Sequence, residues 1–185
     1  LEDGATLEDS KIYSNANFLT DGNKAKKIDT PVVVAKGNVT IKGQVYIRGD
    51  ESATGEYNGK KVGGHPALRI ENGTVNVTEN STLGVYGGGR FATTSIGGNA
   101  LELSNGEVTG KGKLVAIGGA STWGHAGNAV VGTGKITVNY AILNGGNAYG
   151  KGSTPGKSHE KGVELFDTTI GKATDGKVLT VSSEN

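Results

Sequence analysis

The sequence has no cysteine and no methionine, and only 3 prolines and 1 tryptophan among its 185 residues. Without cysteine there can be no disulfide, no thiolate nucleophile and no zinc–sulfur site. The charges nearly cancel, with 19 Lys and Arg against 18 Asp and Glu, so no basic field attracts phosphate and we expect no nucleic-acid partner. The longest apolar runs, such as Leu114 to Ile117, are far shorter than the ~20 residues that span a bilayer, so we expect no membrane insertion.

The chain is rich in glycine. Of its 185 residues 33 are glycine, or about 18%, against roughly 7% in an average protein. The glycines keep no three-residue period, which excludes collagen. A hydrophobic share of 34% and a net charge of only +1 argue against disorder. The chain can therefore bury a core, and we expect its glycines at turns.

An apolar block with a glycine near its end recurs along the chain, at residues 31–39, 67–75, 100–108, 128–136 and 162–170. Its second, fourth and ninth positions are aliphatic. The columns read Val32, Leu68, Leu101, Ala129, Val163; then Val34, Ile70, Leu103, Val131, Leu165; then Val39, Val75, Val108, Ile136, Ile170. The seventh position reads Gly37, Gly73, Gly106, Gly134 and Thr168.

A second short strand is predicted after each block, because apolar residues alternate with others there. The alternating pairs are Val45 and Ile47, Leu83 and Val85, Leu114 and Ala116, Ala141 and Leu143, and Leu179 and Val181. No stretch of ten or more residues has helical spacing. A repeat of ~33 residues built from short strands cannot bury its own apolar columns, but stacked repeats can.

We therefore predict an all-β fold, a right-handed parallel β-helix (a solenoid) of about five to six coils, in a single domain over residues 1–185. Residues 1–30 would form a degenerate first coil, with its strands at Leu7 to Tyr13, and an entry loop. The block glycines would supply a positive φ at a corner, beside residues such as Asn72 and Asn105 that resemble an asparagine ladder. An irregular β-sandwich is the alternative, but it does not explain the columns.

Function is expected in the loops between coils, at residues 15–30, 49–66, 87–99, 118–127 and 145–161, because loops of a solenoid emerge together on one face. These loops contain all three histidines and the only tryptophan. Aromatic rings stack on sugar C–H faces, so a glycan is the expected ligand. The candidate ligand-binding residues are Trp123, Tyr149, Phe91, Tyr57, Arg48, Asp50 and His125. The alternative is that each aromatic side chain packs down onto its own coil.

Metal, cofactor and catalytic chemistry are not expected. The histidines lie in different loops at different offsets, and Asp50, Glu51 and Glu56 are too sparse a cluster for calcium. Arg69 and Glu102 occupy the same position of neighbouring blocks, where opposite charges form a structural pair. Arg48-Gly49-Asp50 is the tripeptide that some integrins read, but three residues arise often by chance.

The blocks Gly98 to Val108 and Gly127 to Ile136 resemble repeats of pectate-lyase-like β-helix surface proteins of bacteria, including adhesins and autotransporter passengers. The resemblance implies a secreted or cell-surface location, while no lyase motif matches, so that family's catalysis does not carry over. We therefore expect a non-catalytic module that binds a polysaccharide, or a host surface glycan or protein, and belongs to a longer surface protein with neighbouring domains. The alternatives are a purely structural stalk and a polysaccharide lyase or hydrolase.

Overall fold

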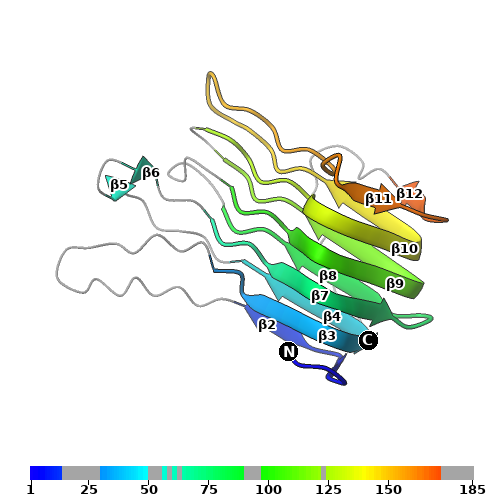
Figure 1. Cartoon of the computed structure of the whole chain (residues 1–185). Helices are drawn as coiled ribbons and strands as arrows, with labels where there is room; N and C mark the ends of the chain where they lie inside the picture. Colours follow the sequence, from blue (N-terminus) through cyan, green and yellow to red (C-terminus); the bar gives the residue numbers. More distant parts are fainter. Residues whose placement is uncertain are drawn as a thin grey trace.

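A computed structural model describes residues 1–13, 30–49, 56–57, 60–61, 64–89, 97–121 and 124–171, which form an all-β structure. Its main feature is a ten-stranded sheet in which every strand pairs in parallel with its neighbours (Figure 1). This arrangement confirms the predicted solenoid and excludes the antiparallel β-sandwich. The described part of the chain has no helix that could cross a membrane.

The strands follow the chain from the N-terminal to the C-terminal end of the stack. They are β1 (Thr6–Glu8), β2 (Lys11–Tyr13), β3 (Val33–Lys42), β4 (Gln44–Arg48), β5 (Glu56–Tyr57), β6 (Lys60–Lys61), β7 (Leu68–Val77), β8 (Thr82–Tyr86), β9 (Leu101–Ile117), β10 (Val130–Asn144), β11 (Val163–Leu165) and β12 (Thr169–Gly171). Strands β5 and β6 form a separate antiparallel pair.

Each coil begins with one of the long strands β3, β7, β9 and β10, which pair in that order, and returns through β4, β8 or the second half of β9 or β10. We call the side of the ten-stranded sheet that contains β3, β7 and the first halves of β9 and β10 the first sheet, and the side that contains β4, β8 and the second halves of β9 and β10 the second sheet. The described residues make about four turns, slightly fewer than the predicted five to six. At the N-terminal end of the stack, Leu7 of β1 pairs with Ile41 and Ile12 of β2 pairs with Ile47. The stack is thus extended at its N-terminal end by a partial coil.

Like residues stack on like residues in the core, as the repeat predicts. The column Val39, Val75, Val108 and Ile136 pairs in register and is almost wholly buried. The second-strand column Val45, Leu83, Leu114 and Ala141 does the same. Because burying one Val, Ile or Leu side chain contributes about 1.5–3 kcal/mol, these columns hold the coils together.

The other two predicted columns are wrong by one residue in two coils. Val33, not Val32, pairs with Leu68, and Val130, not Ala129, pairs with Leu101. The cause is an irregularity in register, at which β3 has the single residue Gly37 where β7 has two. Alignment on the glycines therefore shifts the residues that precede them.

The last coil also departs from the prediction. Leu165, rather than Ile170, pairs with Ile136, and Ile170 pairs with Ala141 of the second-strand column. The main pairing of β11 starts at Gly134, beyond the bend of β10, so this coil is shorter than the others. The predicted strand around Leu179 and Val181 lies outside the described residues.

At most corners glycine is required because a side chain would overlap the neighbouring coil, and not because the backbone has a positive φ. Gly37 has a φ of 76°, as predicted, but in the next two coils the left-handed residues are Asn72 (φ 48°) and Asn105 (φ 52°). Gly73 has no positive φ, and a Cβ there would overlap the backbone oxygen of Gly37. The prediction of a positive φ at Gly73, Gly106 and Gly134 is therefore wrong: close stacking of neighbouring coils excludes a side chain there.

Candidate functional site

The connections from β8 to β9, from β9 to β10 and from β10 to β11 pass through a glycine neck, which we define as Gly88, Gly98, Gly119, Gly127, Gly146 and Gly156. Backbone hydrogen bonds join these residues into a zigzag between segments that leave the second sheet and segments that return to the first. The N–H of Gly98 donates to Gly88 O (2.7 Å), that of Gly119 to Gly98 O (2.9 Å), and that of Gly127 to Gly119 O (2.8 Å). The same pattern continues through Gly146 and Gly156.

The neck explains six of the 33 glycines. A Cβ on Gly119 would overlap the carbonyl oxygen of Gly88, and one on Gly127 would overlap that of Gly98. The backbones touch with no side chain between them, so only glycine fits. Sequence reasoning expected the glycines at turns and missed this packing; the paired glycines at 87–88, 97–98, 118–119 and 145–146 were the available signal.

Beyond the neck, two loops stack on each other as the solenoid predicts. Ser121 forms a parallel bridge with Ala148, and His125 forms one with Thr154. The N–H of Tyr149 donates to Ser121 O at 3.0 Å, which fixes the two loops in register. Figure 1 shows the loop ends emerging on the same side of the stack.

The structure brings two of the predicted ligand-binding residues together on this loop pair. Tyr149 is 60% exposed, and its hydroxyl accepts a hydrogen bond from Asn147 Nδ2 at 3.3 Å. His125 is exposed on the neighbouring loop. Both side chains are therefore available to a ligand.

The other predicted residues are not brought to this loop pair. Arg48 is exposed at the end of β4, in an earlier coil, and pairs in register with Tyr86. Trp123, Phe91 and Asp50 lie outside the described residues. Tyr57 belongs to β5, and its side chain is also outside the description.

The histidines do not share a site. His65 is buried, with Nδ1 at 3.1 Å from the carbonyl oxygen of Thr30, whereas His125 and His159 are exposed. Among the residues that the structure describes, no group of three or more His, Asp or Glu side chains could hold a metal ion.

Where the chain returns to the first sheet, polar side chains are paired between coils. The predicted Arg69–Glu102 pair forms at 2.7 Å. Asn99 Oδ1 accepts the N–H of Asn128 at 3.0 Å, and Asn128 Oδ1 accepts the N–H of Lys157 at 2.8 Å. These bonds form an asparagine ladder at the strand entry, not at the corner where the sequence suggested one.

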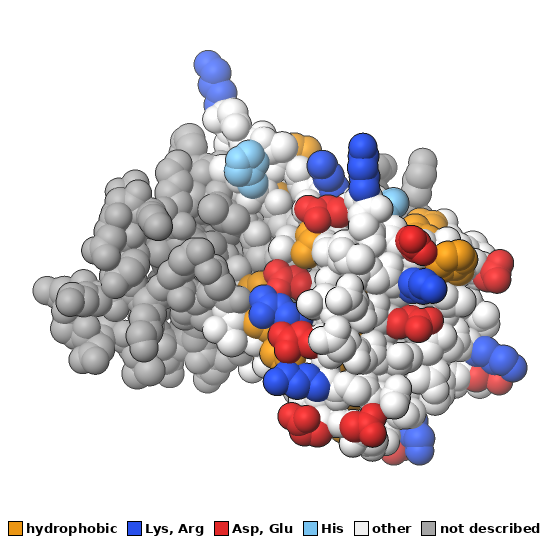
Figure 2. All heavy atoms as spheres, viewed as in Figure 1, with side chains coloured by type: hydrophobic (Ala, Val, Ile, Leu, Met, Phe, Trp, Pro, Cys, Tyr) orange, Lys and Arg blue, Asp and Glu red, His pale blue; other side chains and the backbone are white. Residues whose placement is uncertain are grey.

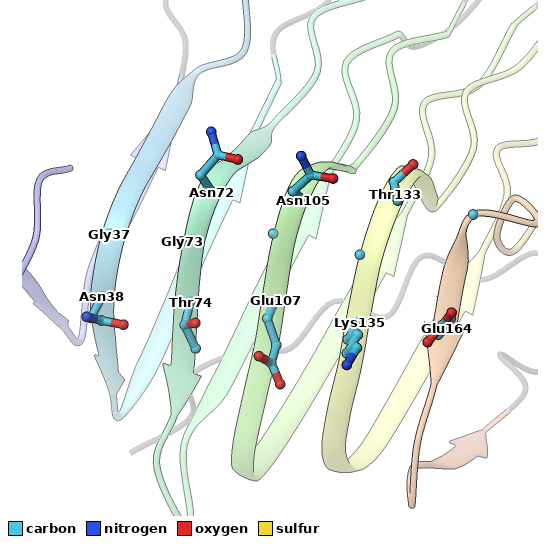
Figure 3. Close-up of a pocket in the computed structure, with 13 residues that line it drawn as sticks. Gly37, Asn38, Asn72, Gly73, Thr74, Asn105, Glu107, Thr133, Lys135 and Glu164 are labelled. Atoms are coloured by element: carbon cyan, nitrogen blue, oxygen red, sulfur yellow. The ribbon is translucent and has the colours of Figure 1, made fainter.

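A shallow groove of about 460 Å³ runs along the outer bend of the first sheet and crosses β3, β7, β9 and β10 to reach Glu164 of β11 (Figure 3). We call it the bend groove. It is lined by Gly37, Asn38, Asn72, Gly73, Thr74, Asn105, Gly106, Glu107, Thr133, Gly134, Lys135, Gly162 and Glu164. Sequence reasoning did not identify this groove, because the irregularities in register that form it are invisible in the repeat.

Polar side chains form two rows in the bend groove (Figure 3). One row contains Asn38, Thr74, Glu107, Lys135 and Glu164, which pair in register from strand to strand. The other contains Asn72, Asn105 and Thr133, which precede the bend glycines. Each coil therefore contributes at least one polar side chain to the groove: an amide, a hydroxyl, a carboxylate or the Lys135 ammonium group.

Two partly buried tyrosines, Tyr46 and Tyr86, lie on the outer face of the second sheet. The Tyr46 ring lies over Gly84, where a Cβ would approach its Cδ1 to 2.5 Å. Burial raises the pKa of Tyr86 to about 12, with a smaller contribution from the neighbouring Tyr46. Burial also raises the pKa of Tyr46.

Charged side chains of both signs are interspersed over the described face in Figure 2.

No protein-family model, no curated protein and no solved structure matches the chain. The resemblance to bacterial surface proteins is thus supported only for the β-solenoid fold and its repeats.

Proposed function

We propose that this chain is a non-catalytic β-solenoid module of a secreted or cell-surface protein, and that its stacked loops bind a glycan or a host surface protein. The observation that carries the proposal is the in-register pairing of Ser121 with Ala148 and of His125 with Thr154. This pairing presents exposed side chains of two loops on one rigid support.

The chemistry of the loop pair suits a sugar. The exposed ring of Tyr149 offers an apolar face for sugar C–H groups, and its hydroxyl, together with the Asn147 amide, offers hydrogen-bonding groups. The glycine neck holds the loop bases by backbone hydrogen bonds, so less conformational entropy is lost when a ligand binds.

A non-catalytic role is supported by the state of Glu102, one of the outward carboxylates on the coils. Its Oε2 accepts hydrogen bonds from Arg69, and its Oε1 accepts one from Asn99 Nδ2 at 3.1 Å. A carboxylate held in this way is poorly placed to act as a general acid or base.

Neighbouring domains and the extracellular location are part of the same proposal. The resemblance of the repeat blocks supports the location.

A glycan array probed with wild type, Trp123→Ala and Tyr149→Ala tests the loop site. Tyr13→Ala is the matched control, since Tyr13 is equally exposed (58%) but lies in the first coil. We expect wild type and Tyr13→Ala to bind the same glycan, and both loop variants to bind it about tenfold more weakly, the loss of one aromatic contact of ~1–1.5 kcal/mol. Binding that is indifferent to both loop variants would refute the loop site, and no binding at all would favour the stalk.

A further inference from the structure

We infer that the bend groove is a second binding site, separate from the loop pair, and that it takes an extended, uncharged polysaccharide lying along the solenoid axis. The groove continues from Gly37 of β3 to Glu164 of β11 across the coils between them. It therefore suits a long ligand rather than a compact one.

Polar side chains recur along the groove at the spacing of the strands, and this recurrence favours a ligand with a repeating structure. Thr74, Glu107 and Lys135 occupy one register position on successive strands, which lie ~4.8 Å apart. A ligand that contacts each strand must itself repeat along its length and run across the strands. A polysaccharide chain has this property, with hydroxyl groups on every unit.

Most hydrogen-bonding side chains in the groove are not used within the described part of the protein. The Asn38 amide donates to Asp3 Oδ1 at 3.0 Å, but the side chains of Asn72, Asn105, Glu107 and Glu164 form no hydrogen bond or ion pair with another described residue. This contrasts with Arg69, Glu102 and the asparagine ladder, where side chains of neighbouring coils satisfy one another. The groove thus has amide and carboxylate groups to offer to hydroxyls.

Lys135 does not pair with the groove carboxylates. It lies in register between Glu107 and Glu164, yet its Nζ is placed over the ring of Phe166, 5.6 Å from the centroid. The two carboxylates are therefore left without a cationic partner among the described residues. A net negative groove repels polyanions such as uronate chains and nucleic acids and favours a neutral polymer.

Backbone forms part of the groove lining. Gly37, Gly73, Gly106 and Gly134 lie between the two polar rows and carry no side chain. An extended peptide is less suitable, because peptides add to sheets at a strand edge and the groove lies on a sheet face.

Titration calorimetry with cello-oligosaccharides of increasing length tests the inference, with oligogalacturonides as the acidic arm. We expect the affinity for the neutral series to rise with length until the ligand spans the groove, and the acidic series to bind at least tenfold more weakly. Failure of all neutral oligosaccharides to bind, or tighter binding of the acidic series, would overturn the inference.

Three variants locate the binding. Thr74→Arg fills the groove, while Asn76→Arg adds the same side chain on the same strand, two residues away and outside the groove lining. We expect at least a tenfold loss for Thr74→Arg and no change for Asn76→Arg. Asn105→Gly removes an amide while keeping a residue that accepts the φ of 52°, so its expected loss of affinity does not depend on misfolding.

The inference is independent of the loop site. Tyr149→Ala is expected to leave oligosaccharide binding in the groove unchanged. Loss of that binding in Tyr149→Ala, or equal losses in Thr74→Arg and Asn76→Arg, would assign the ligand to another surface and contradict the inference.

Discussion

Arg69 and Glu102 meet across two neighbouring coils, with Nη2 of the arginine 2.7 Å and Nε 3.0 Å from the same carboxylate oxygen. The second oxygen accepts the amide of Asn99. The pair is only partly exposed, with 32% and 17% of the two side chains accessible, so it is screened less than a surface ion pair. It stabilises the contact between the coils that start with β7 and β9.

Glu102→Ala is expected to lower the free energy of unfolding by about 1–3 kcal/mol, because it leaves the donors of Arg69 and Asn99 without their acceptor. Glu107→Ala is the matched control, since Glu107 lies on the same strand and has no ion pair among the described residues; its effect should stay within about 0.5 kcal/mol. Urea unfolding measures both. Equal losses would show that the pair contributes nothing specific.

Gly119→Ala is expected to destabilise the protein by about 3 kcal/mol or more, because a Cβ would overlap the carbonyl oxygen of Gly88 in the neck. Gly152→Ala serves as control: it has a φ of 82° but open space around it, so only a backbone cost of about 1–2 kcal/mol is expected. Thermal unfolding compares them. A smaller loss for Gly119→Ala than for Gly152→Ala would contradict the packing of the neck.

Asn72→Ala is expected to cost about 1–2 kcal/mol, because alanine does not favour the left-handed conformation with φ of 48°. Asn72→Gly should be close to neutral, since glycine adopts this conformation readily. The two variants differ little in the contacts that they remove. If both lose the same stability, the amide rather than the backbone conformation is what matters at this corner.

Stability is expected to fall as the pH rises from about 10 toward 12. The pKa of Tyr86 is raised from 10.0 to about 12 by burial, so above pH 10 the unfolded chain loses this proton while the folded protein retains it. The stabilisation from the neutral phenol is complete below pH 10 and is lost as the pH passes through 12. Denaturant unfolding of wild type and Tyr86→Phe across this range should show a shallower decline in the variant; parallel declines would be inconsistent with a buried phenol.

The fold was predictable because the aliphatic residues of the core columns recur in the sequence at the spacing of the coils. Val39, Val75, Val108 and Ile136 recur at the coil spacing and pair in register. The strand starts were less predictable, because the irregularity at Gly37 inserts or removes one residue with no change of residue type. The close approach at Gly119 depends on contacts between distant segments, which a one-dimensional repeat does not contain.

The candidate sites were less predictable than the fold. Tyr149 and His125 were selected from the sequence, and the structure places them, both exposed, on two loops that stack on each other. The bend groove was missed because its residues are ordinary Asn, Thr and Glu side chains on strands. Only the three-dimensional register shows that they form continuous rows.

The most direct test of the account is whether the wild-type chain binds any glycan, measured on an array of neutral and acidic glycans. We expect specific binding of at least one glycan, weakened by Tyr149→Ala at the loop pair or by Thr74→Arg in the bend groove, and unaffected by Tyr13→Ala. An array with no binding, from protein shown to be folded by its circular dichroism, would contradict a glycan-binding role for both the loop pair and the bend groove.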